Sequence, residues 1–96
     1  MFAVILTYHK PIEEIEKHTA THRAWLDQLY TQNVLIMSGP QIPRTGGVLI
    51  ATGGRSKEEL WSILQQDPFH TEGIATYEIY EFNPIKHIAA LKDHVT

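Results

Sequence analysis

The order of strand-like and helix-like segments is the feature that most constrains this fold. Four runs rich in β-branched and aromatic residues predict strands, and two segments with apolar residues at steps of three and four predict helices. The predicted strands are Phe2–Tyr8, Val34–Ser38, Gly46–Thr52 and Ile74–Phe82, the predicted helices are Ile12–Thr31 and Lys57–Gln66, and a short tail helix is expected over Ile85–Lys92. The order β-α-β-β-α-β predicts a ferredoxin-like α+β fold, with both helices on one face of a four-stranded antiparallel sheet.

The length and composition predict one domain and a partner for it. A chain of 96 residues with 43% hydrophobic content is long enough for one core, so we expect a single domain over residues 1–96. It has no cysteine, so packing alone has to hold the fold. The predicted strands are apolar on both sides, while the helices cover only one face. The economical cover for the other face is a second copy, and we therefore expect a homodimer.

Charge and motif content argue against several classes of partner. The 11 acidic and 8 basic residues are scattered along the chain, so no basic stripe indicates nucleic-acid binding. No apolar run approaches 18 residues and no signal-peptide pattern is present, so we expect no membrane partner and a cytoplasmic location. No phosphate-binding or nucleophile-elbow motif occurs, and the Trp and Tyr residues are expected in core or dimer packing. No cofactor is therefore expected.

The best candidate for chemistry is His22 with Asp67. His18 and His22 share the inward face of the first predicted helix, where a histidine is more often a satisfied core residue than a catalytic group. Asp67 precedes Pro68, which is a common way to leave a helix. The predicted topology nevertheless brings Asp67 to the same face of the sheet as His22. A carboxylate there would fix the imidazole tautomer and raise the basicity of the other nitrogen, as a general base requires.

A metal site is the alternative interpretation of the two helix histidines. Their i, i+4 spacing suits a metal, and a third ligand would come from Glu14, Asp67 or His70. The glutamate of the metalloprotease helix motif is absent between them, so we expect no metal. The remaining histidines are expected in solvent without a catalytic role: His9, His87 and His94.

Several short motifs in a fixed order resemble the YciI-like (YCII-related) family. They are His22–Leu26, Met37–Gln41, Gly46–Gly47, and Asp67–Phe69 followed by Gly73. The resemblance implies a dimeric α/β barrel with an active site at the residues that match His22 and Asp67. Beside the pair we expect substrate-binding residues, namely Ser38, Gly39, Pro40, Phe69 and His18.

One position departs from the family pattern. Many members carry an arginine three residues before the histidine, where this chain has Thr19. An anionic substrate group held by that arginine is therefore not implied here. Arg23 and Arg44 are both open as replacements.

These features lead to one preferred function and one rival. We expect a cofactor-independent lyase or isomerase, resembling the family's dehydrochlorinase that acts on a chlorinated hydroxyhydroquinone. In it His22 would be the general acid or base, Asp67 would orient the imidazole, and Ser38 with the Gly39 backbone would polarise a small phenolic or enol-forming substrate. The rival is a non-catalytic module that binds a small ligand in the same pocket.

Overall fold

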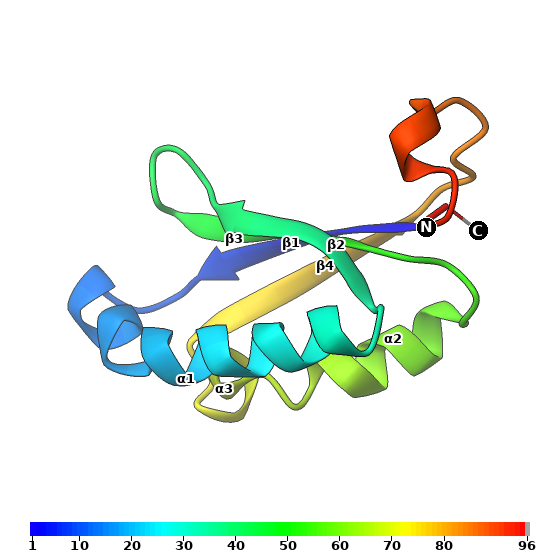
Figure 1. Ribbon diagram of the computed structural model, residues 1–96. Helices are drawn as coiled ribbons and strands as arrows, with labels where there is room; N and C mark the ends of the chain where they lie inside the picture. The colour runs from blue at the N-terminus through cyan, green and yellow to red at the C-terminus, as the bar shows by residue number, and fades with distance from the viewer. Residues whose placement is uncertain (96) are drawn as a thin grey trace.

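The computed structural model describes residues 1–95 and has one sheet with its α-helices on one face (Figure 1). The four strands are antiparallel in the order β2-β3-β1-β4. The strands are β1 (Phe2–Tyr8), β2 (Leu35–Pro40), β3 (Gly46–Ala51) and β4 (Ala75–Glu81), and the helices are α1 (Ile12–Thr31), α2 (Lys57–Leu64), α3 (Pro68–Thr71) and the 3-10 turn η1 (Ala89–Leu91). The predicted ferredoxin-like α+β fold is confirmed.

The alternation of side chains along β1 decides which face carries the core. Phe2, Val4 and Leu6 are buried beneath the helices, whereas Ala3 and Ile5 are only half-buried on the opposite face. Each fully buried large apolar side chain contributes about 1.5–3 kcal/mol relative to exposure. The helices add apolar residues to this core, among them Ile15, Trp25, Leu29, Leu60 and Leu64. The helix-covered face therefore holds the core, and the other face is left open.

The segment after α2 differs from the prediction, and the difference positions Asp67. The helix begins at a capping box formed by Ser56 and Glu59 but ends at Leu64, two residues before the expected end. The chain then turns so that Asp67 caps α3, a four-residue helix that the sequence analysis did not predict. The Asp67 side chain accepts a hydrogen bond from the backbone N–H of Phe69 at 3.0 Å.

A bulge in β2 determines which face of the sheet the last side chains of this strand point to. Leu35 pairs with Ala51 but Met37 pairs with Ile50, so one extra residue lies between them on β2. After this shift Ser38 pairs with Leu49, whose side chain points into the core. The bulge therefore turns Ser38 toward α1, on the same face as Leu35.

The tail helix predicted over Ile85–Lys92 is wrong. This segment contains only the 3-10 turn η1, and it rises on the side of the sheet opposite the helices (Figure 1). Ile85 and Ile88 are 78% and 69% exposed, so the segment has no surface on which to bury an apolar helix face. A helix this short is marginal without such packing.

Two broader expectations stay predictions. The buried apolar residues form one cluster, but the expectation of a single domain over residues 1–96 is not tested by this. Among residues 1–95, no helix combines the length and apolarity needed to cross a bilayer. The cytoplasmic location also stays a prediction.

The first residue of β3 yields a stability prediction. A Cβ added at Gly46 would lie 1.8 Å from the backbone oxygen of Leu6, which cannot move without displacing β1. We expect Gly46→Ala to lower the free energy of unfolding by about 2 kcal/mol or more in urea denaturation. Gly39→Ala is the matched control, because a Cβ there meets no atom within 4 Å. Equal stability of the two variants would contradict this account.

Candidate active site

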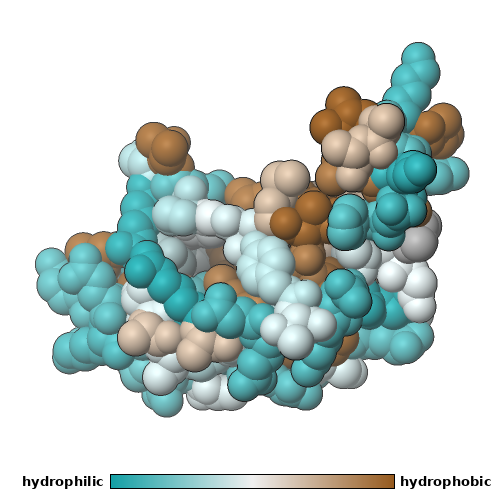
Figure 2. Space-filling model, viewed as in Figure 1, coloured by the Kyte–Doolittle hydropathy of each residue, from teal (hydrophilic) through white to brown (hydrophobic). Residues whose placement is uncertain are grey.

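A pocket of about 350 Å³ lies between α1 and the sheet, and Figure 2 shows it as a hollow in the surface above that helix. Its floor consists of residues paired across three strands. Gly47 of β3 pairs with Leu6 of β1 and with Pro40 of β2, and Ser38 pairs with Leu49 in the next helix-facing row. Because Gly47 has no side chain, the floor is low at its centre. The volume suits a ligand of about one ring.

The predicted His22–Asp67 pair is formed and lies at this pocket. His22 Nδ1 is 2.7 Å from Asp67 Oδ1, across 45 positions of sequence. Asp67 is fully buried, and the His22 side chain is 11% exposed. A carboxylate only accepts hydrogen bonds, so in the neutral imidazole Nδ1 carries the proton and Nε2 keeps a lone pair. Since Nδ1 is turned toward Asp67, the Nε2 edge is the one available to a ligand.

Three donors satisfy the Asp67 carboxylate. Oδ1 accepts from His22 and from the Phe69 backbone, and Oδ2 accepts from the Tyr77 hydroxyl at 2.5 Å. Burial and the neighbouring charge of Asp67 raise the pKa of Tyr77, so its hydroxyl stays a donor. A buried charge needs such partners, and here both oxygens have them. The carboxylate is therefore fixed in position by β4 as well as by its own helix cap.

The plane of the imidazole is fixed by stacking. The rings of His22 and Phe69 are 3.9 Å apart between centroids and only 5° from parallel. Phe69 is buried and also contacts Tyr8 edge to face. One face of the imidazole is thus covered, and rotation of His22 would break both the stack and the bond to Asp67.

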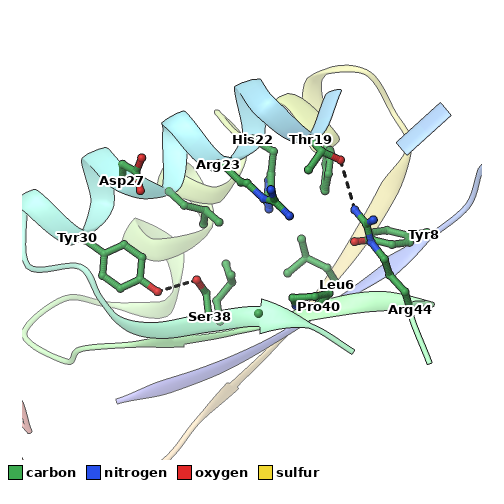
Figure 3. Close-up of a pocket in the computed structure, with 15 residues that line it drawn as sticks. Leu6, Tyr8, Thr19, His22, Arg23, Asp27, Tyr30, Ser38, Pro40 and Arg44 are labelled. Carbon is green, nitrogen blue, oxygen red and sulfur yellow. Dashed lines mark hydrogen bonds between the residues drawn. The ribbon is translucent and has the colours of Figure 1, made fainter. Parts of the chain in front are cut away.

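A hydroxyl pair lies at one end of the pocket. Tyr30 Oη and Ser38 Oγ are 2.6 Å apart and bridge α1 and β2 (Figure 3). Ser38 was predicted, whereas Tyr30 was assigned with the other tyrosines to packing. Tyr30 follows His22 by eight residues, which is close to two helical turns, so helical periodicity alone could have placed it on the same face.

An arginine lies at the opposite end. Arg44, from the connection between β2 and β3, donates from Nη2 to Thr19 Oγ1 at 3.3 Å (Figure 3). Arg23 of α1 also lines the pocket. Arg23 and Arg44, the two residues considered as replacements for the family arginine, therefore both line the pocket. Arg44 is the one with a hydrogen bond to Thr19.

Comparison with known proteins places the chain in a family. The family model of the YCII-related domain matches residues 1–83. The chain belongs to the YCII-related family. A search of curated proteins gives no significant match. A solved structure with the same fold is 5-chloro-2-hydroxyhydroquinone dehydrochlorinase (TftG) from Burkholderia phenoliruptrix AC1100, in complex with 2,5-dihydroxybenzoquinone. It has 22% sequence identity and a TM-score of 0.69, covering 85% of this chain and 93% of that chain.

The other predicted site residues of this YCII-related protein divide into two groups. Gly39, Pro40 and Phe69 line the pocket, and their role in substrate binding stays a prediction. His18 is half-buried one turn before His22 and does not line it. Over residues 1–95, no three His, Asp or Glu side chains come close enough to hold a metal ion. His70, one of the possible third ligands, instead packs edge-on against Trp61.

The Tyr77 contact to Asp67 can be tested against a matched tyrosine on the same strand. Tyr80 also donates to a carboxylate at 2.5 Å, that of Glu78, but on the surface. We expect Tyr77→Phe to lower the free energy of unfolding by about 1–3 kcal/mol, because a buried carboxylate oxygen loses its donor. Tyr80→Phe should leave stability nearly unchanged. Urea denaturation measures both, and equal effects would show that Tyr77 does not support Asp67.

Proposed function

We propose that the pocket is the active site of a cofactor-independent enzyme of the lyase or isomerase kind, in which His22 transfers a proton. The observation that carries the proposal is the 2.7 Å contact between His22 and the fully buried Asp67. It leaves Nε2 as the basic atom at the pocket. A positioned imidazole of this kind contributes about 10²–10⁴ in rate.

The roles of the neighbouring residues follow from their contacts. Asp67 holds Nδ1–H and stabilises the imidazolium that forms when Nε2 takes a proton. The Phe69 stack keeps the ring aligned through both halves of the transfer. Ser38, bonded to Tyr30, and the Gly39 backbone lie on the floor side, where they would stabilise charge that develops on a substrate oxygen.

The pocket favours a small phenolic or enol-forming substrate. Its volume suits one ring, and Leu6 and Leu49 on the floor with Leu26 of α1 supply apolar surface. The structurally similar dehydrochlorinase carries a single-ring hydroxylated quinone in its complex. In a reaction of that class, His22 would take a proton from the ring compound while chloride leaves with the C–Cl bonding electrons. The imidazolium then returns its proton to solvent, so the step needs no oxidant or reductant.

Replacement of His22 tests the proposal. A panel of phenols and enols, including 5-chloro-2-hydroxyhydroquinone, is screened by absorbance and by chloride release. With a substrate in hand, His22→Asn should lower kcat by about 10²–10⁴ without unfolding the protein. His18→Asn is the matched control from the same helix, because His18 does not line the pocket, and it should keep the native rate.

Asp67→Asn separates an enzyme from a simple binding module. An enzyme should lose most of its kcat, because Nδ1 loses its carboxylate partner, while the ligand Kd changes only modestly.

A folded His22→Asn variant with the native rate would remove His22 from the mechanism. Tight binding of a ring compound without turnover by the native protein would favour the binding module.

We propose further that two copies of the chain associate through the open face of the sheet. This face carries Ala3 and Ile5 of β1, Val48 and Ile50 of β3, and the exposed Met37 of β2. Covering these side chains against a second sheet would form the dimeric α/β barrel that the family resemblance implies.

Sedimentation at micromolar concentration tests the dimer. We expect about twice the 11.0 kDa chain mass, because the apolar open face favours association over exposure to water. A monomer under these conditions would contradict the barrel.

A further inference from the structure

One end of the pocket carries the positive charge of Arg44, which has no ion-pair partner in the part of the chain that the structure describes. The Arg44 guanidinium donates to the neutral hydroxyl of Thr19, and among residues 1–95 no carboxylate oxygen lies within 4.0 Å of it. A guanidinium has five N–H donors in a planar fork. The bond to Thr19 therefore leaves most of these donors available to a ligand.

The backbone that carries Arg44 is tied to the sheet on both sides. The N–H of Tyr8 on β1 donates to the oxygen of Thr45 at 3.0 Å, and the N–H of Gln41 donates to the oxygen of Gly46 at 2.9 Å. The base of the connection is thus part of the hydrogen-bonded framework. Arg44 is consequently held near the pocket before any ligand binds, which lowers the entropic cost of binding.

The second arginine of the pocket is placed differently. Arg23 and Asp27 both line the pocket and are four residues apart on α1, but among residues 1–95 no carboxylate oxygen lies within 4.0 Å of the Arg23 guanidinium either. Asp27 therefore offsets the charge of Arg23 only at a longer distance than an ion pair. Arg44 differs in that it donates to the neutral Thr19 hydroxyl, and this bond orients its guanidinium at the end of the pocket.

We propose that Arg44 is the anion-binding residue of the pocket and that the substrates are ring-shaped organic acids. The carboxylate would meet the free edge of the Arg44 guanidinium, where two parallel N–H···O bonds can form. The ring would lie over Leu6, and a hydroxyl or carbonyl at its far side would reach the Tyr30–Ser38 pair, with His22 between the two ends (Figure 3). The inference deepens the proposed function and rests on it only for the role of His22.

Matched acids and amides test the charge requirement in the native protein. Calorimetric titration compares 4-hydroxybenzoate with 4-hydroxybenzamide, which has the same ring and hydroxyl group but no charge. We expect the acid to bind roughly ten- to hundredfold more tightly, as charge-assisted hydrogen bonds to arginine would give. Arg44→Gln should abolish this preference and leave the Kd of the amide unchanged, while Arg44→Lys should keep part of it.

Two further variants decide whether the effect belongs to Arg44. Arg55→Gln is the control, because Arg55 donates to the backbone oxygen of Thr52 and does not line the pocket, and it should keep the native preference. Arg23→Gln should keep most of the preference as well. Loss of the preference in Arg23→Gln but not in Arg44→Gln would overturn the proposal.

The binding experiment is independent of turnover. The proposal is also wrong if the native protein binds the acid no more tightly than the amide, or binds neither compound. His22→Asn should retain the preference for the acid. A protein that prefers acids but turns over no substrate would refute catalysis by His22 and leave the anion site standing. Turnover of neutral phenols without any preference for acids would support catalysis and refute the anion site.

Discussion

The buried carboxylate of Asp67 is the group on which the arrangement of the pocket depends. It caps α3, receives the hydroxyl of Tyr77 from β4 and binds the imidazole of His22 on α1. Three elements that are separate in sequence are therefore joined at one charged group with no contact to solvent. Removing a donor from a buried carboxylate is destabilising, because the charge is then left with fewer hydrogen-bond partners. The geometry of the candidate site and the packing of the helices against the sheet are thus stabilised by the same contacts.

The sheet shapes the pocket through a missing side chain at Gly47 and a bulge in β2. Gly47 lies between Leu6 and Pro40 in the row beneath α1 and adds no side chain to it. The bulge in β2 turns Ser38 to the same side, so a hydroxyl faces the cavity where regular alternation would have turned it toward the open face. Because of these two features, a cavity with apolar sides and polar ends lies between α1 and the sheet, where side chains would otherwise fill the space.

The sequence predicts the elements that have strong local periodicity and the contacts that follow from the order of those elements along the chain. The bounds of β1 and α1 follow from a continuous apolar run and a long helical stripe, and the observed elements begin and end at the expected residues. The approach of Asp67 to His22 follows from the order of elements. Tyr77 and Arg44 reach the site through strand register and loop placement, which local patterns do not encode. The four-residue α3 was missed because one turn has no period, and the tail helix was wrong because its apolar residues have nothing to pack against.

The stacking of Phe69 on His22 has a stereochemical consequence under the proposed mechanism. One face of the imidazole is covered, Nδ1 is committed to Asp67, and the ring sits on α1 above a floor made by the sheet. A substrate lying on that floor meets Nε2 from one direction only. A proton delivered to a prochiral carbon would therefore always arrive on the same face of that carbon, and a product with a new stereocentre would be a single enantiomer.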